Sequence, residues 1–466
     1  MVFSSLLFLT LFLPVTIALY YALPEKAKNF LLLIVSLMFY AWGEPAYVFL
    51  MLITTLYIWC FGLLIEKSNE QKKNLLAKVL LILCLVFSLG TLAYYKYADF
   101  ILENIALVIP IRNTAPALPI GISFYTFQTL SYAIDVYRGN VKAQRSWVNF
   151  AMYISLFPQL IAGPIVRYAD IEHQLVHRKH SYKNIYLGIR RFTVGLCKKV
   201  LFANQIGLLW DTLSASSSLS VLGAWLGAVA FALQIYFDFS AYSDMAIGLG
   251  KMFGFDFTEN FLYPYQSNSI TDFWRRWHIT LGTWFREYVY IPLGGNRKGK
   301  FRLLLNLFIV WSLTGLWHGA DWQFLLWGIY YFLFLTIEKV FLLKRMERWP
   351  TILRRLYTLL IVVVAWVMFA CTDLTSVGNF YKAMFGVGVP LVDKTAIFLL
   401  SSNALLLLVL FFGATAWPKQ ALTTIRKHLR PAYFEVCIYV CCILLLWLCI
   451  AFLVADTYNP FLYFRF

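Results

Sequence analysis

Charged residues are scarce in this sequence. Asp, Glu, Lys and Arg make up 14% of the 466 residues, whereas a soluble domain has about 25%. Apolar residues make up 61% and fall in blocks of about 20, each long enough to cross a bilayer as a helix. The runs also lack the alternating polarity of a spanning β-barrel. We predict an all-α polytopic transmembrane helical bundle with about 11–12 spanning helices and some re-entrant elements.

Cysteine-based chemistry is also missing. The eight cysteines form no CxxC pair and no Cys/His ligand spacing. A disulfide framework or a zinc site is therefore not expected, and we predict no metal. The adjacent Cys441 and Cys442 are best interpreted as lipid-facing packing.

Processing signals, repeats and linkers are absent too. No basic stretch precedes the first apolar run and no A-x-A-like site follows it, so residues 3–23 are expected to be a retained span rather than a signal peptide. No period of 20–50 residues recurs, and no polar linker divides the chain. We predict one domain over residues 1–466, with a motif-bearing core at about 118–342.

Basic residues gather in alternate loops between the predicted spans. The candidate spans are residues 3–23, 28–42, 46–65, 79–101, 118–137, 189–213, 222–250, 303–318, 322–342, 356–371, 395–415 and 434–454. If the N-terminus lies outside, the inside loops hold 33 of the 40 Lys and Arg residues, and loops 103–117, 214–221 and 372–394 with the tail 455–466 hold four. Such an asymmetry sets membrane orientation. It predicts an extracytoplasmic N-terminus and explains the net charge of +17 without nucleic acid.

Two stretches fit neither spans nor ordinary loops. Residues 148–166 begin and end on the predicted cytoplasmic side, and Pro158, Gly163 and Pro164 would break a helix there. Residues 260–302 mix aromatic and charged side chains. Both are expected to be re-entrant or interfacial elements, and because irregular backbone at membrane depth needs protein or water around it, both predict a cavity open to the cytoplasm.

Six histidines occur, and two of them stand out. His173 and His177 have the i, i+4 spacing of a metal face, but the surrounding Lys and Arg favour a solvated basic loop. His278, in DFWRRWHITL, and His318, near the end of an apolar helix, are each equally compatible with a structural and a catalytic role. An ionisable group inside a membrane indicates function by default, and imidazole titrates near neutral pH, so the pair favours proton transfer.

Other polar residues predict a wet interior. Asp238 and Asp244 lie within one apolar helix. Pairing with Arg190, Arg191 or Arg275 is the structural alternative, which we favour for Asp244 and leave open for Asp238. The segment LGGNRKGK at 293–300 offers glycines and basic side chains for a phosphate group, although such loops are common.

Five blocks together resemble the membrane-bound O-acyltransferase (MBOAT) family, and most closely its alginate O-acetyltransferase branch. They are FYAWGEPAYVFLM (39–51), FPQLIAGPIVRY (157–168), FDFSAYSDMAIGLGKMFGF (237–255), DFWRRWHITLGTWFREYVYIPLGGNR (272–297) and LTGLWHGADWQFLLWG (313–328). The resemblance runs to about residue 340, and beyond it the chain is similar only in hydrophobicity.

The resemblance implies a helical fold with a tunnel through the membrane centre and the histidine of the WHG motif at its waist. It implies that His318 is the general base, which removes a proton from an acceptor hydroxyl as the oxygen attacks a thioester. His278 would orient or polarise the reacting groups, and would stabilise the oxyanion together with the Trp317 indole N–H.

The resemblance also implies substrates. The acyl donor would be acetyl-CoA presented from the cytoplasm, with Arg286, Arg297 and Lys298 meeting its phosphates. We expect Asp238, Trp277 and Trp284 to line the tunnel, where tryptophans would keep bulk water from the thioester.

The implied function is O-acetylation of an extracytoplasmic polysaccharide across a bacterial cytoplasmic membrane. The acceptor would be alginate, peptidoglycan, cellulose or another exopolysaccharide, and a periplasmic or extracellular SGNH-type acetyltransferase or esterase would be the partner. The alternatives are D-alanyl transfer to teichoic acid from a carrier-protein thioester and, in a different class, a transporter or flippase. The absence of internal repeats argues against a transporter.

Overall fold

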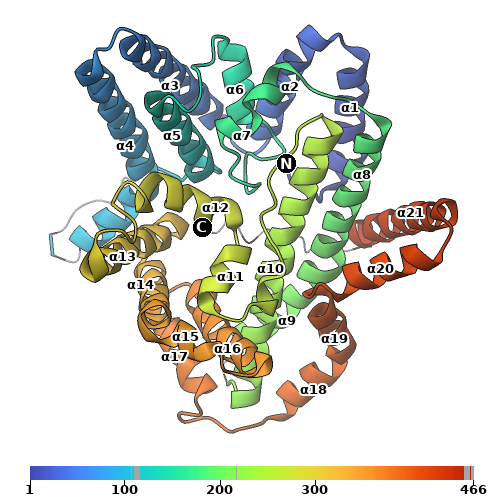
Figure 1. Ribbon diagram of the computed structural model, residues 1–466. Helices are drawn as coiled ribbons and strands as arrows, with labels where there is room; N and C mark the ends of the chain where they lie inside the picture. The colour runs from blue at the N-terminus through green and yellow to red at the C-terminus, as the bar shows by residue number, and fades with distance from the viewer. Residues whose placement is uncertain (107, 110–115, 217, 456–461, 463–466) are drawn as a thin grey trace. The chain divides into compact units, whose positions relative to one another are not determined.

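The computed structural model describes residues 1–106, 108–109, 116–216, 218–455 and 462, and throughout this part of the chain the secondary structure is helical, with no strand (Figure 1). The gaps fall within the predicted external loops 103–117 and 214–221 and the tail 455–466, whose masked parts lie outside the described residues.

The helices of the first half follow the apolar blocks of the sequence. They are the π-helical turn Phe8–Phe12 with α1 (Leu13–Ala22), α2 (Glu25–Ala41), α3 (Tyr47–Glu70), α4 (Asn74–Ala106), α5 (Ile122–Arg138), α6 (Trp147–Ser155), α7 (Tyr168–Val176), α8 (Tyr182–Cys197), the π-helical segment Lys198–Ala203, α9 (Asn204–Ser214) and α10 (Val221–Met252).

Short helices are interspersed with long ones in the second half. They are α11 (Ile270–Arg276), α12 (Ile279–Phe285), the π-helical turn Arg286–Tyr290, α13 (Gly299–His318), α14 (Trp322–Ile337), the π-helical turn Glu338–Leu342, α15 (Leu343–Met346), α16 (Thr351–Ala370), α17 (Leu374–Met384), α18 (Lys394–Ser402), α19 (Ala404–Gly413), α20 (Trp417–His428) and α21 (Pro431–Ala455).

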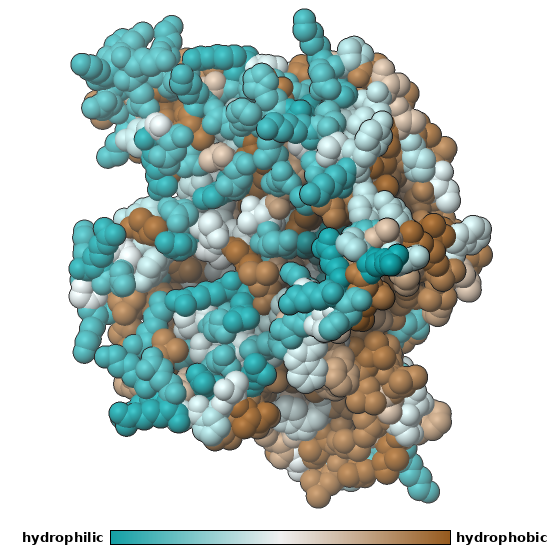
Figure 2. All heavy atoms as spheres, turned by 45° about the vertical axis from the view of Figure 1, so that its right-hand side comes forward, coloured by the Kyte–Doolittle hydropathy of each residue, from teal (hydrophilic) through white to brown (hydrophobic). Residues whose placement is uncertain are grey.

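Eight helices of the described chain are long and apolar enough to cross a membrane, and α18 with α19, bent by 57°, makes a ninth if the pair is one span. Every predicted span is helical, but residues 3–23, 28–42 and 118–137 form helices of 17 residues or fewer. Large apolar side chains on α21 are exposed, and Figure 2 shows broad hydrophobic patches on the face in view. Lipid rather than water suits such a surface, and the protein is a multi-pass membrane protein.

The contacts divide the chain into two compact units. The first consists of Met1–Phe192, Ser243–Glu259 and Thr283–Val289, and the second of Thr193–Tyr242, Asn260–Gly282 and Tyr290–Phe466. The predicted single domain stays a prediction, because neither unit has been tested for independent folding.

In the first unit, α3, α4 and α5 pack side by side (Figure 1). The stretch 148–166 is interrupted as predicted: its helix, α6, ends at Ser155, three residues before Pro158. Its re-entrant or interfacial placement stays a prediction. The non-helical residues after α6 are buried, as irregular backbone within a membrane protein must be.

In the second unit, α13 and α14 form a tight hairpin through glycines. A Cβ at Gly315 would lie 2.3 Å from the Phe324 carbonyl oxygen, and one at Gly328 would lie 2.3 Å from that of Trp311. Only glycine permits this approach. The hairpin fixes His318, the last residue of α13, against α14.

Candidate active site

His318 lies inside a box of aromatic rings. Its imidazole, 5% exposed, stands edge-on to Trp317, Trp327 and Phe369, with ring centroids 5.0, 5.2 and 5.2 Å away. These rings come from α13, α14 and α16. Edge-to-face packing of this kind is favourable and holds the imidazole in one orientation.

His278 occupies the turn between α11 and α12 with a backbone φ of +46°. A residue other than glycine rarely adopts this left-handed conformation, and the strain, roughly 1–3 kcal/mol, is typical of functional sites. The ring is 1% exposed. It packs edge-on against Phe239, 4.7 Å away between centroids, and its Nδ1 lies 3.2 Å from Asn260 Oδ1.

The ring of Trp317 contacts the rings of both histidines. Its ring centroid lies 6.0 Å from that of His278 and 5.0 Å from that of His318. The three residues proposed for catalysis from the sequence are therefore neighbours in the second unit, although the two histidines are 40 positions apart in the sequence.

Trp277 and Asp238 also belong to the second unit. Trp277 is buried and packs against Phe273 and Trp366. Asp238 pairs with Lys199 (Oδ1 to Nζ, 2.7 Å) and accepts a hydrogen bond from the Leu462 N–H at 3.0 Å. The partner of Asp238 is thus a lysine and not one of the arginines considered. The places of Trp277 and Asp238 along a tunnel stay predictions.

Arg297 and Lys298 lie at the exposed end of the Gly-rich loop. The loop turns through Gly294 and Gly295, both at positive φ, and the buried Asn306 amide donates to the carbonyls of Leu293 and Gly295. A rigid loop that presents two cations suits a phosphate-bearing ligand. Their role in donor binding remains a prediction.

Trp284 and Arg286 belong to the first unit. Trp284 stacks on Phe127 at 3.7 Å between centroids, and its indole N–H donates to the Phe127 carbonyl oxygen at 2.9 Å. Arg286 is exposed and lies 3.7 Å from the Glu287 carboxylate. The expected roles of Trp284 in the tunnel and Arg286 at the donor therefore stay predictions.

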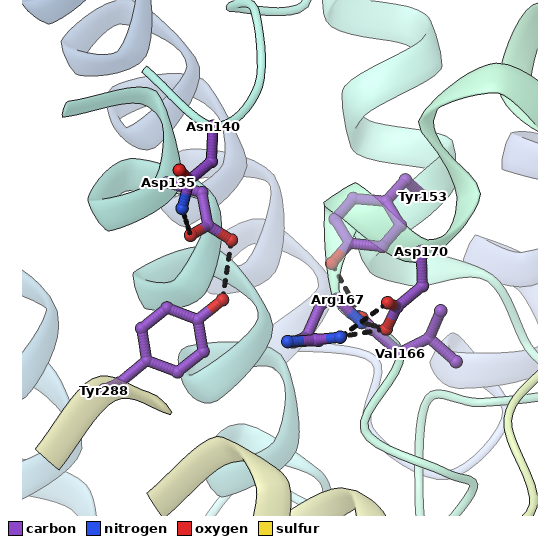
Figure 3. Close-up of polar contacts among 7 residues, drawn as sticks. All are labelled: Asp135, Asn140, Tyr153, Val166, Arg167, Asp170 and Tyr288. Atoms are coloured by element: carbon purple, nitrogen blue, oxygen red, sulfur yellow. Dashed lines mark hydrogen bonds and ion pairs between the residues drawn. The ribbon is translucent and has the colours of Figure 1, made fainter. Parts of the chain in front are cut away.

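A polar cluster that includes Tyr288, from the same π-helical turn as Arg286, was not expected from the sequence (Figure 3). The Asp135 carboxylate accepts hydrogen bonds from Tyr288 (2.6 Å) and Asn140 (3.1 Å). Burial, and then Asp135, raise the pKa of Tyr288 above its usual value. In the same view, Arg167 pairs with Asp170, and Tyr153 donates to the Val166 carbonyl oxygen. This cluster ties the turn after α12 to α5.

Other ionisable residues have structural partners. Arg191 pairs with both Asp244 and Glu259, so the arginine partner expected for Asp244 is confirmed. His173 and His177 lie 5.3 Å apart between ring centroids. Within the described part of the chain no group of three or more His, Cys, Asp or Glu residues is placed to hold a metal.

Sequence comparison places both histidines within a known family. The family model of the membrane-bound O-acyltransferases matches residues 39–379. The chain belongs to the MBOAT family. It is accordingly an O-acyltransferase, as the resemblance of its motifs predicted.

The MBOAT relatives include O-acetylating enzymes. A protein of Pseudomonas aeruginosa named "Probable alginate O-acetylase" is 43% identical over 394 residues, which cover 83% of this chain and 75% of that protein. A protein of the same name from Pseudomonas putida is 39% identical over 487 residues and covers both chains fully. A peptidoglycan O-acetyltransferase of Helicobacter pylori is 33% identical over 425 residues, 83% of this chain and 80% of its own.

These matches correct one expectation. The likeness to the MBOAT relatives does not stop near residue 340, because the Pseudomonas putida protein matches over the whole chain. The C-terminal helices contain none of the five blocks on which the resemblance rested, so the resemblance could not be extended to them.

Proposed function

We propose that this O-acyltransferase takes acetyl groups from cytoplasmic acetyl-CoA for the O-acetylation of an extracytoplasmic polysaccharide, with an SGNH-type partner protein completing the transfer. The names of the relatives support acetyl transfer to a polysaccharide. The basic residues gathered in alternate loops support an extracytoplasmic N-terminus in a bacterial inner membrane. Alginate, peptidoglycan, cellulose and other exopolysaccharides remain open as acceptors.

The observation that carries the proposal is the contact of Trp317 with both imidazoles inside a buried aromatic site. In the proposed step, His318 takes the proton of a hydroxyl while the hydroxyl oxygen attacks the thioester carbonyl carbon. The C–S bond then breaks, and the departing sulfur of coenzyme A takes that proton from the His318 imidazolium and leaves as the thiol. Base catalysis of this kind contributes about 10²–10⁴-fold, and the aromatic box limits hydrolysis by excluding water.

Purified protein in lipid vesicles tests this function. Vesicles with the predicted cytoplasmic face outward receive [¹⁴C]acetyl-CoA, with the partner and polysaccharide inside, and label on the polysaccharide is measured. We expect transfer by the wild type and by His428→Gln, whose histidine is exposed on α20, and none by His318→Gln.

Two results would refute the proposal. Label transferred only from a D-alanyl carrier-protein thioester would favour D-alanyl transfer to teichoic acid. Movement of a solute across the vesicle membrane with no covalent transfer would favour a transporter.

A further inference from the structure

Asn260 places two acceptor atoms, its backbone carbonyl oxygen and its side-chain Oδ1, at the turn that contains the strained His278. Its carbonyl oxygen accepts the Ile279 N–H at 3.0 Å, and its side-chain Oδ1 accepts the N–H and the hydroxyl of Thr280 at 3.2 and 2.9 Å. The same Oδ1 lies 3.2 Å from His278 Nδ1. Asn260 is fully buried. One side chain therefore holds both the turn after His278 and the imidazole itself.

These contacts determine which ring nitrogen carries the proton. The two ends of an asparagine amide look alike and are assigned from their partners. The backbone N–H of Thr280 can only donate, so the atom that faces it must be the amide oxygen. An amide oxygen can only accept, so His278 Nδ1 must be the donor. A neutral His278 then carries its proton on Nδ1 and a lone pair on Nε2.

The other ring nitrogen remains available to a ligand. His278 Nε2 is buried, and among the described residues nothing forms a hydrogen bond with it. A buried acceptor without a partner is unfavourable, and in a native protein such a group calls for an explanation, of which a catalytic role is one. The edge of the ring toward Phe239 and Trp317 is packed, so the orientation of the lone pair is fixed.

We propose that Asn260 is a positioning residue that locks His278 in the Nδ1–H tautomer, so that Nε2 accepts a hydrogen bond from a donor of the bound substrate other than the hydroxyl that His318 deprotonates. The tautomer follows from the contacts alone, whereas its role in the reaction rests on the proposed function. This role differs from the oxyanion contact expected for His278, because the single N–H of the neutral ring is committed to Asn260. The Trp317 indole is the remaining donor proposed for the oxyanion.

The tautomer is measured by solid-state ¹⁵N NMR of histidine-labelled protein in lipid, with the His278 signals assigned by their loss in His278→Gln. We expect a protonated Nδ1 and an unprotonated Nε2 in the wild type at neutral pH. A wild-type spectrum with Nε2 protonated and Nδ1 bare would overturn the inference, whatever the protein transfers.

Substitutions separate positioning from folding. Asn260→Leu removes the acceptor, and we expect Nε2–H to appear and kcat to fall roughly 10²-fold with a smaller change in KM. Asn260→Asp keeps an acceptor oxygen, so Nδ1 stays protonated and most of the activity returns. His428→Gln, at an exposed histidine of α20 away from these contacts, should keep the wild-type His278 spectrum and kcat.

The assignment of the His278 tautomer and the proposed acetyl transfer can be refuted independently of each other. An Asn260-dependent Nδ1–H signal in a protein that transfers no acetyl group would retain the tautomer and refute the proposed function. Normal acetyl transfer by Asn260→Leu, with Nε2–H dominant, would refute the positioning role alone. If Asn260→Leu does not fold, the wild-type spectrum and the Asn260→Asp variant still show which ring nitrogen of His278 carries the proton.

Discussion

Replacing His318 with residues that keep its packing isolates its chemistry. His318→Phe keeps a ring edge-on to Trp317, Trp327 and Phe369, whereas His318→Gln keeps polarity and loses those ring contacts. If the imidazole is the general base, both variants lose about 10²–10⁴-fold in kcat. At 1.36 kcal/mol per tenfold, the barrier rises by about 2.7–5.4 kcal/mol.

Thermal unfolding should distinguish the two variants where activity does not. An aromatic pair is worth about 0.5–1.5 kcal/mol beyond its buried area, so loss of three pairs gives His318→Gln a lower melting temperature than His318→Phe. The assay is label transfer from [¹⁴C]acetyl-CoA, with His428→Phe as the exposed control. If His318→Phe retained wild-type kcat, the imidazole could not be the base.

Three further substitutions test the surroundings of the site. The double variant Arg297→Ala/Lys298→Ala should raise the KM for acetyl-CoA about tenfold with less effect on kcat, measured by steady-state kinetics. Glu338→Ala should destabilise the protein by about 3 kcal/mol, because its buried carboxylate accepts the N–H groups of Ile270 and Thr271 at 2.6 and 2.8 Å; denaturation in detergent measures the loss. Gly328→Ala should cost about 1–3 kcal/mol, since its Cβ would overlap a backbone oxygen of α13, and should lower the melting temperature.

Each of these substitutions has a control. Lys419→Ala removes an exposed cation of α20 and should leave the KM unchanged, while an unchanged KM in Arg297→Ala/Lys298→Ala would remove both residues from the donor site. Glu347→Ala, on an exposed residue, should not alter stability. A Gly328→Ala protein as stable as the wild type would mean that α13 and α14 can separate without loss.

The membrane-spanning helices could be predicted because each needs a continuous run of apolar residues long enough to cross the bilayer, and such a run is visible in the local sequence. Each predicted span became helical, and the break at Pro158 followed from the chemistry of proline alone. The lengths of the helices were harder to predict, because apolar composition does not specify where a helix must end. Two of the predicted spans correspond to α2 and α5, which have 17 residues each.

The site was predictable only in part. Composition favoured His278 and His318 as a pair, and the motif resemblance gave them roles, but their shared contact with Trp317 depends on tertiary packing. Asn260 was missed because an asparagine 18 residues before His278 has no local pattern that links it to the ring. The polar residues in NFLYPYQSNS were the one available indication.

Buried ion partners were the hardest to predict. Asp244 pairs with an arginine as favoured, but Asp238 pairs with Lys199, which lies within the predicted span 189–213. Glu338 was likewise counted within a predicted span, although its carboxylate holds the start of α11. Sequence periodicity identifies a polar residue in an apolar segment and does not select its partner.

A double-mutant cycle on kcat for acetyl transfer tests most directly whether the two imidazoles act as one site. If they do, His278→Gln/His318→Gln loses no more activity than the more damaging single variant, because residues that act as a unit are strongly non-additive. A double variant whose loss equals the product of the two single losses would show that the histidines act independently, and would contradict the shared site at Trp317.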